Sequence, residues 1–175
     1  MRYHATAQLA GRTFEDITVD VGFGDAVVGG PELVRGPELL SFADIPPVEV
    51  PALPLGQHIA EKVHAYTRSY PGGSPSTRVK DLVDLAVISS LFSLEAGRLR
   101  RALVTTFASH GTHPLPSAIP PPPPSWRVAY RRMAADAGMD PDMAVGYQQT
   151  KAFWDPILAG TTSNDGEWNP AAGTW

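Results

Sequence analysis

Hydrophobic and polar residues alternate at the start of the chain, first over residues 3–9 and again over residues 17–23. A period of two is typical of a β-strand with one face buried, and the Ala-Gly-Arg-Thr sequence at 10–13 has the composition of a turn. We therefore predict a β-hairpin with one half-buried face. Residues 24–54 are rich in Gly and Pro, which predicts a long surface connection with at most a short edge strand at 48–50.

The pattern changes to helical spacing at residue 55. Apolar residues recur every three or four positions over residues 55–70, and a Pro-Gly-Gly sequence at 71–73 ends the predicted helix. A second helix is predicted over residues 78–92, with Ser76 or Thr77 as its cap. Because this helix is apolar on nearly every side beyond its first turns, we expect it to be buried.

The rest of the chain predicts three more helices and a proline-rich spacer. The helices cover residues 93–109, with a Ser93 cap and Gly111 beyond the end, then 125–138, and then 140–154, with Asp140 as cap. Residues 114–124 hold seven prolines, five of them consecutive, which is typical of a polyproline II spacer without packed structure. The tail from residue 160 is irregular, and we expect Trp168 and Trp175 to anchor it.

These elements predict an α+β fold in which a small antiparallel sheet precedes a mainly helical region. The chain divides into four parts on this basis. They are a hairpin with its connection (1–54), a first helical region (55–113), the proline-rich linker (114–124) and the C-terminal helices with the tail (125–175).

Composition narrows the class of protein. The net charge of −4 argues against a broadly basic nucleic-acid-binding surface. The absence of cysteine excludes disulfides, thiolate metal sites and a cysteine nucleophile. No apolar run approaches the roughly 18 residues of a membrane span, and the first residues lack the apolar region of a signal peptide. We therefore expect a cytoplasmic protein with no membrane partner.

Charged residues are scarce, at 18% of the chain, yet they cluster in two segments. One is Ala60-Glu61-Lys62, and the other places Arg78, Asp81 and Asp84 three residues apart, hence on one stripe of a helix. Lys80 reaches Asp84 at a spacing of four. Such charges are often an ordinary solvated surface, where a pair contributes at most about 0.5 kcal/mol. Here the stripe adjoins apolar residues predicted to be buried, which favours a functional site.

The histidines give weaker signals. His110 and His113 are three apart, but they lie at a predicted helix end beside a proline and lack companion ligands in the sequence. His58 and His64 are six apart and share a helical face poorly. The default interpretation of all four is a satisfied or solvent-facing side chain.

Taken together, residues 60–65 (AEKVHA) and 78–85 (RVKDLVDL) resemble motifs III and IV of the AbiEii-type nucleotidyltransferase toxins. This family belongs to the DNA polymerase β-like nucleotidyltransferase superfamily. Residues 17–25 are similar to the third core strand of the family, and Trp168-x-Pro170 with Trp175 resembles its C-terminal ending. The resemblance implies that the predicted sheet is a remnant of the polymerase β-like core, followed by the helical region.

The resemblance also implies roles for individual residues. Lys62 matches the motif III lysine that contacts the nucleotide triphosphate, and Asp81 matches the active-site acid of motif IV. Residues implied to bind the nucleotide or arrange the site are Glu61, Arg78, Lys80 and Asp84. Glu61 is equally consistent with an ion pair to a neighbouring Lys or Arg. Asp20 lies where many members of the superfamily have a third metal-binding carboxylate, so we expect it to share one cleft with Lys62 and Asp81.

The implied activity is transfer of a nucleoside monophosphate from an NTP with Mg²⁺, in some members to the acceptor end of tRNA. The resemblance further implies a toxin–antitoxin or abortive-infection system with a cognate antitoxin. The Gly-Ser and Asp-x-Asp motifs, which hold the triphosphate and the metals, are expected before residue 1. We therefore expect a truncated or split C-terminal portion with an unpaired sheet edge, inactive in transfer by itself. The alternative is a non-catalytic module that binds a nucleotide or an antitoxin.

Overall fold

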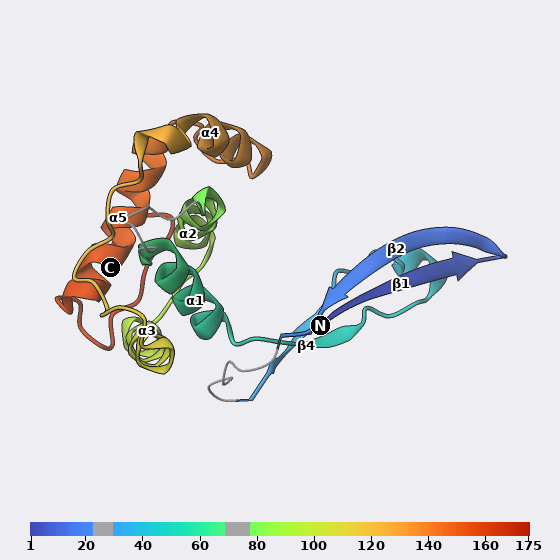
Figure 1. Ribbon diagram of the computed structural model, residues 1–175. Coiled ribbons are helices and arrows are strands. Elements are labelled where there is room, and N and C mark those ends of the chain that lie inside the picture. Colours follow the sequence, from blue (N-terminus) through green and yellow to red (C-terminus); the bar gives the residue numbers. More distant parts are fainter. Residues whose placement is uncertain (23–29, 69–77) are drawn as a thin grey trace.

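Two β-hairpins and a body of five α-helices make up the described part of the chain, as Figure 1 shows. The computed structural model describes residues 1–22, 30–68 and 78–175. The strands are β1 (Arg2–Leu9), β2 (Arg12–Asp20), β3 (Glu32–Arg35) and β4 (Glu49–Ala52). The helices are α1 (Leu55–Thr67), α2 (Val79–Leu91), α3 (Ala96–His110), α4 (Arg127–Asp136) and α5 (Met143–Ala159), with short 3-10 turns at Ser41–Ala43 and Pro124–Trp126. Antiparallel strands followed by helices confirm the predicted α+β class.

The first hairpin pairs β1 with β2 in antiparallel register, with Tyr3 opposite Val19 and Ala5 opposite Ile17. The hairpin is therefore confirmed, but the predicted half-buried face is wrong. Tyr3, Ile17 and Val19 are each about half exposed, because the ribbon stands apart from the helices (Figure 1) and no described element covers it. The outer edges of this ribbon pair with no other described strand, as expected. Residues 23–25 of the predicted strand lie outside the described residues.

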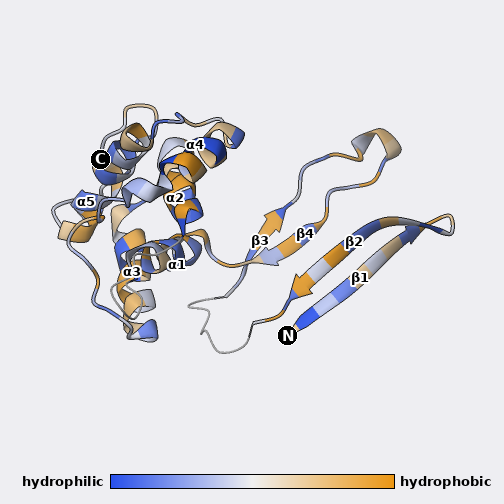
Figure 2. Ribbon diagram, turned by 45° about the horizontal axis from the view of Figure 1, so that its top comes forward, coloured by the Kyte–Doolittle hydropathy of each residue, from blue (hydrophilic) through white to orange (hydrophobic). Residues whose placement is uncertain are grey.

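A second hairpin of β3 and β4 corrects the prediction of a long surface connection with one edge strand. Leu33 lies opposite Pro51 and Val34 opposite Val50. A two-stranded ribbon tolerates Pro51 because each strand has an open edge, where a missing N–H is not needed. Figure 2 shows apolar residues along both strands. The Leu55 amide at the start of α1 donates to the Glu32 carboxylate at 3.3 Å, which connects this hairpin to the helical body.

Among the described residues, the hydrophobic core lies in the helical body and in the proline-rich and tail segments packed onto it. Helix α1 packs against α2 and α3, and α5 packs against α2 (Figure 1). The fully buried residues at these contacts include Ile59, Val63, Leu82, Leu85 and Leu103. The predicted burial of the second helix is confirmed for most of its length, since Leu82 and Leu85 are inaccessible to solvent, whereas Leu91 at its last position is 66% exposed. The proposed stop at 71–73 and the proposed caps at 76 and 77 lie outside the described residues.

Two predicted caps are wrong, and one helix end is confirmed. Helix α3 begins after Glu95, because the Ser93 hydroxyl hydrogen-bonds to the tail of the chain at the Trp168 carbonyl (3.0 Å). Its end is confirmed at Gly111, whose φ of 58° favours glycine. Helix α5 is capped by the carboxylate of Asp142, which accepts from an amide in the first turn at 2.8 Å, instead of by Asp140.

The proline-rich segment packs onto the body, so the expectation of a spacer without packing is wrong. Ile119 is 2% exposed, and its amide donates to the Asp155 carboxylate at 2.9 Å. The Tyr66 hydroxyl donates to the Pro120 carbonyl at 2.7 Å. A polyproline II strand leaves its own carbonyls unpaired, which makes them available to such donors.

The two tail tryptophans are confirmed as anchors. Trp168 is 2% exposed, and its indole N–H donates to the Ser89 carbonyl at 2.6 Å. The Trp175 indole donates to the Phe153 carbonyl at 2.8 Å. None of the described helices has the length and apolar character needed to cross a bilayer.

Candidate functional site

A pocket of about 340 Å³ lies where the C-terminal half of α1, the first turn of α2 and the end of α3 meet. Charged and titratable side chains dominate its lining, among them Glu61, Lys62, Arg68, Arg78, Asp81 and His110. The pocket thus brings together residues of both sequence motifs. Lys62 also lines an adjoining pocket with Lys80 and Asp84. A larger hollow beside α4 and α5, of about 670 Å³, contains none of the motif residues.

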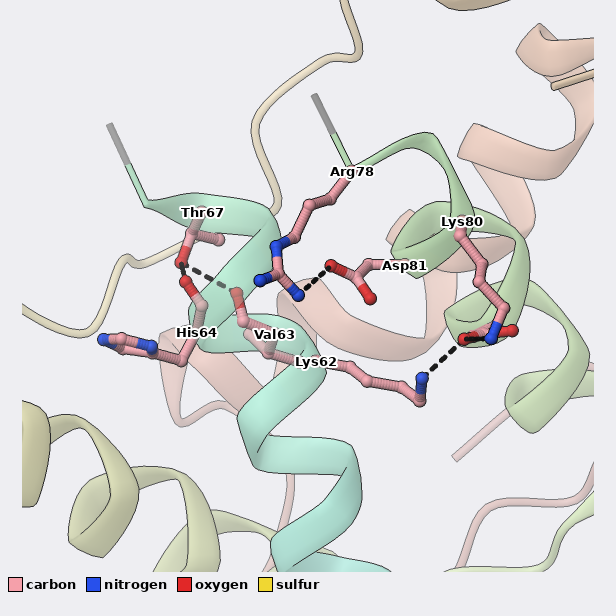
Figure 3. A network of polar contacts seen from close by, with 8 residues as sticks. Lys62, Val63, His64, Thr67, Arg78, Lys80 and Asp81 are labelled. Carbon is pink, nitrogen blue, oxygen red and sulfur yellow. Dashed lines mark hydrogen bonds and ion pairs between the residues drawn. The ribbon is translucent and has the colours of Figure 1, made fainter. Parts of the chain in front are cut away.

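Lys62 connects the two motifs through an ion pair. Its ammonium group donates to the Asp84 carboxylate at 2.5 Å, and the Lys80 ammonium lies 3.7 Å from the same oxygen (Figure 3). The expected pair between Lys80 and Asp84 is therefore present, and the contact with Lys62 across two helices was not predicted. The Lys62 and Asp84 side chains are 18% and 24% exposed, whereas Lys80 is 74% exposed. The carboxylate consequently holds Lys62 extended from α1 towards α2.

Asp81 is the buried acid of the pocket. It is 7% exposed, and its Oδ2 atom has no hydrogen-bond partner among the described residues. The Arg78 guanidinium lies 4.0 Å from this oxygen (Figure 3). Burial raises the pKa of Asp81, and the positive charges of Lys62 and Arg78 offset this only in part. A buried carboxylate oxygen without a hydrogen bond costs folding free energy, which is typical of residues retained for a function.

Two stacked imidazoles, those of His64 and His110, form the wall of the pocket between α1 and α3, and a third, His113, lies against His64 outside the lining. His64 is 4% exposed and stacks on His110, with ring centroids 4.2 Å apart. Burial, together with the neighbouring His110 and His113 rings, lowers the pKa of His64 to about 4. One His64 nitrogen hydrogen-bonds with the Thr112 hydroxyl at 2.8 Å. His64 is thus a buried and satisfied side chain, which agrees with the default interpretation.

The structure changes the interpretation of two residues in this wall, Glu61 and His110. Glu61, left open between a site residue and an ion-pair partner of Lys or Arg, is paired with His110 at 2.8 Å. The expectation that His110 lacks companion ligands is wrong, because Glu61 and His64 lie beside it. Sequence reasoning missed this grouping since its members come from helices far apart in the chain. The visible signal was the Glu-x-x-His spacing of 61 and 64 within the first motif.

Asp20 is the sequence-predicted residue that lines neither this pocket nor the adjoining one. It lies on β2, where its carboxylate accepts two hydrogen bonds from the Arg2 guanidinium at 2.6 and 2.7 Å. This contact lowers the pKa of Asp20. The expected cleft shared with the hairpin is therefore not formed by the described residues, whereas Lys62 and Asp81 do share one pocket.

The described residues do not fit a Mg²⁺ site. Mg²⁺ prefers an octahedral set of oxygen ligands, usually including carboxylates. The Asp84 carboxylate is paired with the ammonium groups of Lys62 and Lys80, and Asp20 lies on the separate hairpin. The group of ligand-type side chains that does converge in the described part of the chain is Glu61, His64 and His110, and two of its three members are imidazoles.

A comparison with protein families adds to this geometry. The model described as "Nucleotidyl transferase AbiEii toxin, Type IV TA system" matches residues 1–155 of the chain. The match includes both hairpins and the two helices that carry the motifs. No curated protein matches the sequence. The chain belongs to the AbiEii nucleotidyl transferase toxin family, whose toxins are assigned to type IV toxin–antitoxin systems.

Proposed function

We propose that the pocket between α1 and α2 binds the triphosphate of an NTP and forms part of a nucleotidyltransferase active site. The observation that supports this most directly is the joint lining of one pocket by Lys62, Arg78 and Asp81. Two cationic groups and one buried acid, contributed by the two motifs, converge there. The reaction class is transfer of a nucleoside monophosphate to an acceptor hydroxyl, with release of pyrophosphate.

Each residue has a role that follows from its chemistry. Lys62 serves as a point charge for phosphate oxygens, and Arg78 offers the planar guanidinium that suits two-point phosphate contacts. Asp84 positions the Lys62 ammonium, and the exposed Lys80 adds positive charge at the rim. Asp81 is buried with a raised pKa, which suits a carboxylate that accepts a proton from the attacking hydroxyl.

The acceptor we propose is the end of a tRNA, on the basis of the family resemblance. The positive charges of Arg68, Arg78 and Lys80 around the pocket favour an anionic backbone. The proposed protein partner is the cognate antitoxin implied by the type IV class.

A second candidate is a module that binds NTP without turnover. The observation that favours it is the donor set around the pocket, which does not fit Mg²⁺ within the described residues. Phosphoryl transfer depends on metal ions that neutralise charge on the phosphates. Binding depends only on the cationic side chains, so binding and transfer are separable.

Calorimetric titration with each of the four NTPs tests the binding step. We expect Lys62→Ala to weaken binding at least tenfold. Lys151→Ala is a matched control, since Lys151 is also paired with an aspartate (Asp155, 3.0 Å) but lies on α5 outside the pocket. Absence of binding in the unchanged protein, or equal effects of the two variants, would refute the assignment of the pocket.

Labelled-nucleotide transfer to tRNA in the presence of Mg²⁺ separates the two candidates. Transfer that Asp81→Ala abolishes supports the nucleotidyltransferase. Binding without transfer supports the non-catalytic module. Transfer that survives Asp81→Ala contradicts the role of Asp81 proposed here.

A further inference from the structure

Three side chains with metal-binding atoms converge on one wall of the pocket. Glu61 and His64 are three residues apart on α1 and therefore lie on one helical face. His110 is the last residue of α3, which packs beside α1. The carboxylate oxygen and the two imidazole nitrogens all lie within 4.8 Å of one another.

We propose that Glu61, His64 and His110 bind one divalent transition-metal ion, with Zn²⁺ as the best match. Two imidazoles and one carboxylate are the protein ligands of many catalytic zinc sites, in which a fourth position stays open. Imidazole ligands favour Zn²⁺ and similar ions, whereas Mg²⁺ and Ca²⁺ favour all-oxygen sets. The cluster lies in the same pocket as the cationic residues assigned to the nucleotide but shares none of those residues, and the inference stands without that assignment.

The surroundings of His64 resemble the supporting shell of a metal ligand. Metal-bound histidines usually form a hydrogen bond through the second ring nitrogen, which fixes the ring orientation. A chain of contacts provides this, from His64 to Thr112 (2.8 Å), from Thr112 to His113 (3.0 Å) and from His113 to Thr67 (2.9 Å). The Phe107 ring packs against His64 in a T-shaped arrangement, with ring centroids 5.0 Å apart. The hydrogen bond between Glu61 and His110 does not by itself explain why His64, the third member of the cluster, is buried beside them.

The geometry requires a modest closure on binding. Bonds of about 2.0–2.2 Å in a tetrahedral zinc site place ligand atoms roughly 3.3 Å apart. The three ligand atoms must therefore approach by at most about 1.5 Å from their present separation. Glu61 and His110 are 32% and 23% exposed, so they have room to turn and give the ion access from solvent.

The charges around the cluster determine which ligand suits the open position. Arg68 and Arg78 line the same pocket and oppose a bare cation, and Glu61 is the carboxylate that offsets them. A bound ion with an open position would attract water or an anionic oxygen, such as that of a phosphate.

Calorimetric titration of the tag-free, EDTA-treated full chain with ZnCl₂ tests the site without any nucleotide. We expect one ion per chain. Glu61→Gln and His110→Gln, at partly exposed positions, should each weaken binding at least tenfold, and Thr112→Ala by about 10- to 100-fold through loss of ring orientation. His58→Gln is the control, because His58 lines the same pocket outside the cluster. Circular dichroism confirms the fold of each variant.

Two results would overturn the proposal. One is the absence of zinc binding, and the other is binding that neither Glu61→Gln nor His110→Gln weakens. Substitution with Co²⁺ gives a second readout, since intense visible absorption indicates a four-coordinate site, and its loss in His110→Gln indicates that this imidazole is a ligand. Because nucleotide is absent throughout, a failure here leaves the result of the NTP titration unaffected.

Discussion

The ion pair between Lys62 and Asp84 has both a structural and a proposed functional role, and substitutions can separate them. Removing one partner of a buried pair costs about 3–5 kcal/mol, whereas an exposed pair contributes at most about 1 kcal/mol. At 18% and 24% exposure this pair lies between those limits, and Asp84 retains Lys80 at 3.7 Å. We therefore expect Lys62→Met and Asp84→Leu each to lower the free energy of unfolding by about 2 kcal/mol.

The double variant should recover much of this loss, because two apolar side chains of similar size replace both charges. A loss of about 1–2 kcal/mol in the double variant corresponds to a coupling energy of about 2–3 kcal/mol. Urea unfolding followed by tryptophan fluorescence measures all four proteins. The pair of Lys151 and Asp155 provides the control cycle, and its coupling should be smaller because Lys151 is 45% exposed.

Nucleotide titration of the same double variant tests function apart from stability. A folded Lys62→Met/Asp84→Leu protein should have lost its NTP affinity, since the phosphate-binding charge is gone. Undiminished affinity would refute the role of Lys62. A coupling energy no larger than that of the control pair would refute the argument from burial.

Three further predictions concern single residues. Because the folded-state pKa of Asp81 lies above its unfolded value near 3.9, the folded protein binds more protons between those two values, so stability should fall as pH rises through that range. Asp81→Asn should remove this dependence in urea unfolding at several pH values and stabilise the protein at neutral pH. Replacing a helical glycine with alanine usually stabilises a protein. Gly146→Ala should instead lower the free energy of unfolding by about 1–3 kcal/mol, because the new methyl group overlaps the buried Tyr130 hydroxyl. Adding Tyr130→Leu in a double variant should relieve this overlap. Trp168→Ala should lower the free energy of unfolding, measured by thermal or urea unfolding, by about 3–5 kcal/mol. The substitution leaves a cavity and an unpaired Ser89 carbonyl.

The helices could be predicted because burial imposes a period that is visible within one segment. The all-round apolar character of α2 predicted its burial, and Gly111 predicted the end of α3. An alternating strand shows only that one face is apolar, and it does not show whether another element covers that face, as β1 and β2 demonstrate. Strand β3 spans Glu32–Arg35, which is too short to display a period.

In the candidate site, too, contacts within one helix can be predicted from spacing, whereas contacts between helices cannot. The spacing of Lys80 and Asp84 predicts their pair, but the closer partner of Asp84 is Lys62, which comes from another helix. The Glu-x-x-His spacing of Glu61 and His64 likewise places two potential ligands on one face, a pattern also used by metal sites in helix bundles. The third proposed ligand, His110, lies 49 residues after Glu61, and the packing of α3 against α1 brings it within reach. A Glu-x-x-His pair on one helix therefore predicts a three-ligand site only where a histidine at the end of a packed helix, such as His110, can reach it.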